Sequence, residues 1–430
     1  MSIRDVVRNI SLVSSAEARA LYDRLTSDDH SGTRDDGSSI LISGGELFNK
    51  GAQAMTYTVV DEISRRYPNK RVYLLSEQDY LRDPAEKDAY TFEILPWDSE
   101  IQLSLLAPYA NLTNTQSHPT EVHRSVRNAF EDCRMILDIN GYALSSQMGA
   151  RMSFSYLTTV LLARMYSVPM YILPQSIGPF DYSLPMRLLL DPLMRTYLPY
   201  PKMICPREED GVRALEPYTR ANVRREFDIV LQGGEYDLEN IYVTDRGIEV
   251  RTLPDDAVGI VPNSKVFERT SNELFYAMYE QLIDCLLELD KEVYVLRHST
   301  EDLELCKAIC EPFTRVNAVH MLDDDFDAPE LEALIAQFEY MIASRYHSIV
   351  HGYKHGVPVV AIGWAVKYDE LLRRFDQSQY FFDVRDGLDV QRLTDAVVRM
   401  DRNSGTESAG IASTAESIKE RALFDNVFEE

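Results

Sequence analysis

The chain has 430 residues, of which 45% are hydrophobic and 26% are charged, and its formal net charge at pH 7 is −25. A chain of this length is too long for one ordinary hydrophobic core, so two domains are expected. The strong acidic balance argues against a nucleic-acid partner, because a phosphate backbone is bound by a basic protein face.

Three features of the sequence bear on the compartment. No uninterrupted apolar run reaches about 18 residues, so no transmembrane segment is expected. Residues 1–25 carry charges inside their apolar stretch and lack the hydrophobic region of a signal peptide. The five cysteines are an odd number spread along the chain, which fits a reducing compartment. Two of them, Cys306 and Cys310, lack further ligands at zinc spacing and are expected to be buried thiols. These features together predict a cytoplasmic protein.

The first half of the chain alternates strand-like and helix-like segments. An amphipathic helix is expected at 15–26, and a polar connection follows at 27–39. Short apolar runs predict strands at 40–42, 71–75, 134–139, 168–173 and 202–205, and a long apolar helix is expected at 152–167. The segment 76–128 carries no recognisable motif and is interpreted as loops.

The second half repeats this alternation after a charged, turn-rich segment at 233–256. Strands are expected at 257–263 and 292–298, helices at about 270–289 and 301–312, and a loop at 403–417. Asp327 is expected to cap a helix, with Pro329 in its first turn and Glu330 completing a capping box. Alternation of this kind predicts parallel sheets with right-handed crossovers. The expected regions are a helix and linker at 1–37, then two Rossmann-like α/β domains at 38–250 and 257–430, facing a central cleft.

Ligands of open parallel sheets bind beyond the carboxyl ends of the strands, so candidate site residues are sought there. The first strand is followed by Gly44, Gly45, Asn49 and Gly51, which lead into a helix. Glycines at a helix N-terminus suit an anion, although the pattern is not the GxGxxG of dinucleotide sites, and an ordinary tight turn fits as well.

Three later strands of the first domain also end in polar residues. The strand at 134–139 is followed by Asn140, and the strand at 168–173 is followed by a shaped loop with Gln175, Ser176 and Gly178. Arg207 follows the strand at 202–205 and precedes three acidic residues. Arg207 therefore either pairs with these acids or faces the cleft.

In the second domain Asn263 and His298 follow strands, and Asp302 lies four residues after His298. A catalytic His–Asp pair is conceivable there, but a helix cap beside a base is the preferred interpretation. His347, His351 and His355 lie four apart on one helical face. Without a nearby carboxylate this is a weak metal pattern, and we expect helix-face residues instead.

The most informative segment is 341–375, which predicts strand, helix, strand and helix in succession. Arg345 and His347 come where its first strand ends, and Lys367 comes just after its second. Two cations and a titratable imidazole at neighbouring strand ends predict an anion site that contains an acid or base.

These residues share their order and spacing with one known family. They are the turn with Gly44, Gly45, Asn49, Gly51, Ala52 and Ala54; the loop 175–180; Arg207; and the set Arg345, His347, Gly356, Val357, Pro358 and Lys367. On them the chain resembles the polysaccharide pyruvyl transferase family over roughly 38–376. Relatives often carry Gly-Gly where this chain has Asn140 and Gly141.

The resemblance implies a GT-B-like fold with the acceptor on the N-terminal domain and the donor on the C-terminal domain. It implies transfer of pyruvate from phosphoenolpyruvate to two hydroxyls of a sugar, free or lipid-linked, in polysaccharide or exopolysaccharide biosynthesis. No metal or cofactor is expected besides phosphoenolpyruvate as co-substrate. Whether the chain forms a homo-oligomer is left open by the sequence.

Carried onto this sequence, the family's roles fall on the strand-end residues. The catalytic candidates are His347, Arg345 and Arg207. The donor-binding candidates are Arg207, Arg345, His347, Lys367, Gln175, Ser176, Gly178 and Asn263. Two alternatives stay open at this point: a glycosyltransferase of the same architecture that uses a nucleotide sugar, and a non-catalytic relative that binds sugar or a partner protein.

Overall fold

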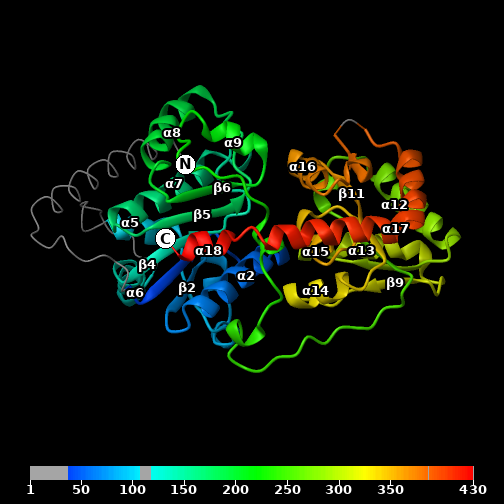
Figure 1. Ribbon diagram of the computed structural model, residues 1–430, viewed down its shortest axis with the longest axis horizontal. Coiled ribbons are helices and arrows are strands. Elements are labelled where there is room, and N and C mark those ends of the chain that lie inside the picture. Colours follow the sequence, from blue (N-terminus) through cyan, green and yellow to red (C-terminus); the bar gives the residue numbers. More distant parts are fainter. Residues whose placement is uncertain (1–36, 107–117, 386, 430) are drawn as a thin grey trace, which may run out of the picture. The chain divides into compact units, whose positions relative to one another are not determined.

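The computed structural model describes residues 37–106, 118–385 and 387–429. The helix expected at 15–26 and most of the connection expected at 27–39 lie outside these residues. The chain divides into two compact units (Figure 1). The first unit contains residues up to Glu46, Val59–Glu226 and Asp237–Asp245, and the second contains Leu47–Thr58, Phe227–Tyr236 and Arg246–Glu430. Two segments that precede the expected boundary, 47–58 and 227–236, thus group with the second unit.

The first unit is built on a six-stranded sheet in the order β3-β2-β1-β4-β5-β6. All neighbouring strands pair in parallel. The strands are β1 (Ser39–Ser43), β2 (Arg71–Leu75), β3 (Glu93–Leu95), β4 (Cys133–Asp138), β5 (Met170–Gln175) and β6 (Met203–Pro206). The central strand β1 is buried at every position, which explains why it appears in the sequence as an unbroken apolar run.

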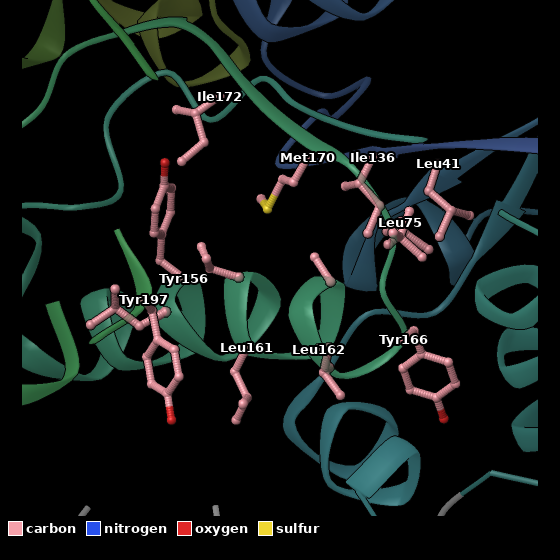
Figure 2. Packing of buried hydrophobic residues seen from close by; sticks show 14 of the residues in the cluster. Leu41, Leu75, Ile136, Tyr156, Leu161, Leu162, Tyr166, Met170, Ile172 and Tyr197 are labelled. Atoms are coloured by element: carbon pink, nitrogen blue, oxygen red, sulfur yellow. The ribbon is translucent and has the colours of Figure 1, made fainter. Parts of the chain in front are cut away.

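Helices cover this sheet and complete its core. They are α3 (Glu77–Tyr80), α4 (Pro84–Lys87), α5 (Ser99–Leu106), α6 (Thr120–Glu131), η2 (Ser146–Met148), α7 (Ala150–Met165), α8 (Leu184–Tyr197), α9 (Glu209–Leu215), η3 (Leu238–Asn240) and the end of α2 (Lys50–Arg66). The start of α2, up to Thr58, groups with the second unit. Figure 2 shows Leu161 and Leu162 of α7 with Ile136 and Met170 of the strands. Because α7 is apolar over most of its surface, it occupies the middle of the core.

The second unit has its own parallel six-stranded sheet, in the order β12-β11-β10-β7-β8-β9. Its strands are β7 (Ala257–Val261), β8 (Glu292–Leu296), β9 (Val319–Leu322), β10 (Tyr340–Ala343), β11 (Val359–Gly363) and β12 (Phe381–Asp383). Its helices are α10 (Ile229–Gln232), α11 (Ser264–Phe267), α12 (Asn272–Glu288), η4 (Thr300–Asp302), α13 (Leu303–Cys310), η5 (Glu311–Phe313), α14 (Ala328–Ile335), α15 (Tyr346–Lys354), α16 (Val366–Arg374), η6 (Ser378–Tyr380), α17 (Val390–Lys419) and α18 (Leu423–Phe428).

Local signals in the sequence located these elements well. Each expected strand is present within two or three residues of its predicted ends. The capping box is also confirmed, because Asp327 accepts from the Glu330 N–H and Glu330 accepts from the Asp327 N–H. Gly356 follows the end of α15 with φ +74°, the left-handed conformation that glycine adopts most easily.

The loop expected at 403–417 is wrong, since these residues lie inside the 30-residue helix α17. The helix buries Leu393, Val397, Met400, Ile411 and Ile418 at helical spacing. Gly, Ser, Thr and Ala dominate the intervening positions and obscure this period, and tertiary burial overrides their weak helix propensity. The segment 76–128 was interpreted as loops, yet its described residues contain α3, α4, β3, α5 and α6. Among the described residues, none of the helices is long and apolar enough to span a membrane.

Candidate active site

The strand ends of the second unit bring its predicted site residues to one edge of the sheet. Strand β10 lies between β7 and β11 and runs parallel to both. Asn263 after β7, Arg345 after β10 and Lys367 after β11 therefore lie at the same edge. Arg345 is the N-cap residue of α15, but its side chain makes no capping hydrogen bond. The first turn of α15 thus presents backbone N–H groups with no side-chain cap, an arrangement that suits an anion.

Arg345 holds two carboxylates in this structure. Its Nε donates to Asp302 Oδ2 at 2.8 Å and its Nη2 donates to Asp302 Oδ1 at 2.7 Å, which is a bidentate pair. Nη2 also donates to Glu301 and to the Ser264 hydroxyl. Burial alone would lower the pKa of Arg345, but Asp302 and Glu301 more than offset it and raise that pKa. The Asp302 side chain is fully buried, whereas that of Glu301 is 50% exposed, so only Glu301 can be exchanged readily for a ligand.

His347 lies beside two residues that are distant in sequence. Its Nε2 lies 3.5 Å from Oδ2 of Asp228, whose carboxylate is fully buried and caps α10 by accepting from the Val230 N–H. On its other side is Gly51, in the first turn of α2. A Cβ on Gly51 would lie 2.1 Å from His347 Nδ1, so only glycine leaves room for this imidazole.

The two remaining histidines near this site are buried and neutral. His351 is fully buried, and neither of its ring nitrogens has a hydrogen-bond partner in the described chain. Burial lowers the pKa of His351 to about 3, and burial also holds the pKa of His298 well below its usual value. The two rings meet edge to face, with centroids 5.3 Å apart. Within the described residues, no group of three or more His, Cys, Asp or Glu side chains could hold a metal ion.

His355, the third member of the histidine series, takes part in a separate buried ion cluster. Its Nε2 lies 3.2 Å from Glu332, and Lys354 Nζ lies 2.8 Å from the same carboxylate. The Tyr236 hydroxyl also donates to Glu332. Glu332 is buried, and burial alone would raise its pKa, but Lys354 and His355 together hold that pKa well below its usual value.

Lys367 and Asn263 have different environments at the same edge. Lys367 is half-buried, and its Nζ lies over the rings of Tyr346 and Tyr368, 5.2 and 5.8 Å from their centroids. Asn263 is buried and structural in its contacts, since it accepts from the Lys265 N–H and donates to the Ser344 carbonyl. It thereby connects the ends of β7 and β10.

The predicted glycine-rich turn divides into two parts. Gly44 has φ +76° and packs against the Asn140 side chain, which leaves no room for a Cβ. Asn49 lies further on, and its Oδ1 accepts from the N–H groups of Gly51 and Ala52, so it caps the start of α2.

The remaining predicted residues form a buried network in the first unit. Arg207 is 4% exposed, and its Nη2 donates to the Gly141 carbonyl and to the Ser176 hydroxyl, each at 2.9 Å. Ser176 in turn donates to Glu208, whose carboxylate also lies 3.8 Å from Arg207 Nε. Gly178 adopts φ +75° before a cis peptide bond to Pro179.

A second buried carboxylate lies at the end of β4. Asp138 accepts hydrogen bonds from Gln175, Ser43 and Asn140. Burial raises the pKa of Asp138 although all three bonds act to lower it. Asp138 therefore connects the ends of β1, β4 and β5, and Gln175 is its partner on β5.

Asp228 and the role of Gly51 were missed from the sequence. Asp228 precedes the apolar run 229–231, a pattern that predicts a helix cap and no contact with His347. Gly51 was noted only as part of an anion-binding turn. No local pattern could join either residue to a histidine so much later in the chain.

Comparison with known proteins gives one family and one fold. The family model described as Polysaccharide pyruvyl transferase matches residues 49–365, which include all the residues of the second-unit edge except Lys367. Among curated proteins, none matches the chain.

Solved structures share the fold at low sequence identity. A Medicago truncatula protein in complex with UDP-glucose matches with a TM-score of 0.52 at 8% identity, covering 93% of this chain and 99% of that one. The glycotransferase of kitacinnamycin matches with a TM-score of 0.52 at 12% identity, covering 91% and 98%. These matches confirm the expected α/β, GT-B-like fold class with two Rossmann-like domains. Since the family model covers most of the sequence, the chain belongs to the polysaccharide pyruvyl transferase family, a family of enzymes.

Proposed function

We propose that this protein transfers pyruvate from phosphoenolpyruvate to two hydroxyls of one sugar residue, which become a cyclic ketal. The observation that carries the proposal is the pairing of His347 and Arg345 at the start of α15, inside the segment that matches the family. The acceptor is a sugar of a polysaccharide or of its free or lipid-linked precursor. The proposed place of the reaction is the cytoplasm, with phosphoenolpyruvate as co-substrate and no other cofactor.

In this proposal His347 is the general acid. It gives a proton to the methylene carbon of phosphoenolpyruvate, and the adjacent carbon then forms a bond to the first sugar hydroxyl oxygen. Phosphate leaves that carbon as the second hydroxyl oxygen adds. Of the two hydroxyl protons, one replaces the proton given by His347 and the other leaves with phosphate, so the reaction is balanced without an oxidant. An imidazole suits this role because its usual pKa lies near neutrality.

Asp228 and Gly51 are proposed as positioning residues for His347. A buried carboxylate beside Nε2 favours the protonated imidazole and fixes the orientation of the ring. Gly51 has no Cβ and therefore lets the imidazole lie directly against the start of α2.

The donor carries a phosphate and a carboxylate, so it requires at least two cationic contacts. Arg345 is proposed to retain Asp302 and to exchange Glu301 for the donor phosphate, because Glu301 is the more exposed partner. Lys367 adds a point charge at the same edge of the second unit. Five further residues remain proposed for the donor site: Arg207, Gln175, Ser176, Gly178 and Asn263. Arg207 and Gln175 are proposed to act chiefly by ordering their loops.

The test is a comparison of donors followed by product analysis. Phosphoenolpyruvate should raise the melting temperature by mass action, and it should yield inorganic phosphate and a pyruvylated sugar in equal amounts. H347A should lose this turnover while its melting temperature stays near that of the wild type. H320A is a matched control, because His320 lies in β9 and contacts Glu292.

Two outcomes would contradict pyruvyl transfer and favour another function. Stabilisation by a nucleotide sugar, with release of free nucleotide and a hexose gain in the product, would assign a glycosyltransferase. Stabilisation by neither class of donor would favour a non-catalytic relative.

A further inference from the structure

The proposed donor chemistry leaves unused a cavity of about 720 Å³ in the first unit. It lies beyond the carboxyl ends of β1, β2, β3 and β4, and the N-terminal half of α7 forms part of its wall. The network of Arg207, Gln175 and Ser176 belongs to the ends of β5 and β6 and does not line it. Its volume falls in the range of about 300–1,000 Å³ that is usual for small-molecule sites.

The charge of this cavity excludes an anionic ligand. Its ionisable lining consists of the carboxylates of Glu46, Glu77 and Asp98 and the guanidinium of Arg151. Three negative groups against one positive group disfavour phosphoenolpyruvate or a nucleoside diphosphate, because like charges repel most strongly in a partly desolvated space. An uncharged ligand is compatible with this lining, whereas an anion is disfavoured.

Two of these carboxylates, Glu46 and Asp98, are half-buried, and only Asp98 has hydrogen-bond partners among the described residues. Asp98 accepts from the N–H groups of Glu100 and Ile101 and from His118. Glu46 is half-buried and, among the described residues, makes no hydrogen bond or ion pair. Burial and the nearby Asp79 raise the pKa of Glu46. A lone carboxylate on a cavity wall can accept hydrogen bonds only from the ligand or from water.

The rest of the lining suits a flat ring that carries hydroxyls. Trp97 lines the cavity and stacks on Phe130, with centroids 5.4 Å apart and an interplanar angle of 14°, so its indole is held in place. Gln102 and Ser155 also line the cavity and hydrogen-bond each other through Nε2 and Oγ at 3.0 Å. An aromatic ring can stack on the apolar face of a sugar, and nearby carboxylate, amide and hydroxyl groups can hydrogen-bond to the sugar hydroxyls.

We propose that this cavity binds the carbohydrate acceptor, an uncharged sugar ring that stacks on Trp97 and donates a hydroxyl hydrogen bond to Glu46. The identity of the sugar as acceptor rests on the proposed function, but its binding does not. Binding can therefore be measured without any donor present.

The chain offers a direct probe, because Trp97 and Trp364 are its only tryptophans. In a W364F background the indole fluorescence comes from Trp97 alone. Neutral methyl glycosides of gluco, galacto and manno configuration, with and without an N-acetyl group, should change this fluorescence saturably. In the same background E46Q should weaken the binding of the responding glycoside roughly tenfold, since hydrogen bonds to charged groups are the strong ones. E93Q is the matched control, because Glu93 is an exposed carboxylate of β3 that does not line the cavity.

The outcomes separate this proposal from the proposed function. If no glycoside changes the Trp97 fluorescence, or if E46Q binds as tightly as E93Q, the cavity is not a sugar site, even where phosphoenolpyruvate still stabilises the protein. If phosphoenolpyruvate changes this fluorescence saturably in place of the glycosides, the charge argument is wrong. If a glycoside binds in an E46-dependent way but no pyruvyl transfer occurs, the sugar site stands and the proposed reaction fails.

Discussion

Replacing Gly51 by alanine tests the geometry around His347 most sharply. The new Cβ would lie 2.1 Å from Nδ1, 2.4 Å from Cγ and 2.8 Å from Cβ of His347. Non-bonded atoms settle at about 3.5 Å, so the imidazole must move by about 1.4 Å. Rotation of the ring alone does not suffice, because the Cβ atom of His347 is also too close.

The expected result of G51A is a loss of activity out of proportion to any loss of stability. A displacement of about 1 Å at a reacting group can lower the rate by about 10²-fold, and we expect a fall in kcat/KM of at least this size. Overpacking costs about 1–3 kcal/mol, while alanine gains up to about 1 kcal/mol over glycine in a helix. The free energy of unfolding should therefore fall by no more than about 3 kcal/mol.

The assay combines phosphate release from phosphoenolpyruvate, with acceptor present, and urea unfolding of the same preparations. G405A is the matched control, because Gly405 lies in α17 with open space where its Cβ would be. G405A should keep full activity and gain about 1 kcal/mol in stability. Wild-type kcat/KM in G51A would refute the reasoning that His347 needs the space beside Gly51.

Three further predictions follow from the same contacts. E301Q should lower the KM for phosphoenolpyruvate severalfold, because Arg345 loses a competing carboxylate; an unchanged or higher KM would remove Arg345 as a donor contact. D228N keeps the cap of α10 but removes the negative charge beside His347. The alkaline limb of the pH–rate profile should therefore move to lower pH. An identical profile would show that Asp228 does not act on His347. Burial lowers the pKa of His351 to about 3 in the folded protein, whereas the usual pKa of about 6.5 applies when the chain is unfolded. Between these two values the unfolded chain binds one more proton than the folded protein. The free energy of unfolding therefore decreases as pH falls below about 6.5, by up to about 1.4 kcal/mol per pH unit. H351L should therefore lose less stability than the wild type between pH 7.5 and 5.5 in urea unfolding, and equal losses would contradict the burial argument.

The fold was predictable because its strands are short apolar runs buried on both faces, as β1 and β10 are. Caps such as Asp327 with Glu330 were predictable because their partners lie three residues apart. Helix α17 was not, since its buried positions are spaced by small polar residues and only the packed structure shows what they contact.

The candidate site was predictable only in part. The strand-end rule brought Arg345, Asn263 and Lys367 to one edge of the second sheet, because parallel strands share the direction of their carboxyl ends. The ion pair of Arg345 with Asp302 and the contact of His347 with Asp228 were not predictable. Both depend on pairing between distant segments, which leaves no periodic signal in the sequence.

In the proposed reaction His347 protonates the methylene carbon of phosphoenolpyruvate during ketal formation. The reaction should be run in D₂O with phosphoenolpyruvate and the acceptor sugar, and the product methyl group should be examined by NMR. We expect one deuterium in each product methyl group from the wild type and no product from H347A. A ketal formed by H347A at the wild-type rate, or a wild-type product whose methyl group carries no deuterium, would contradict the proposed reaction.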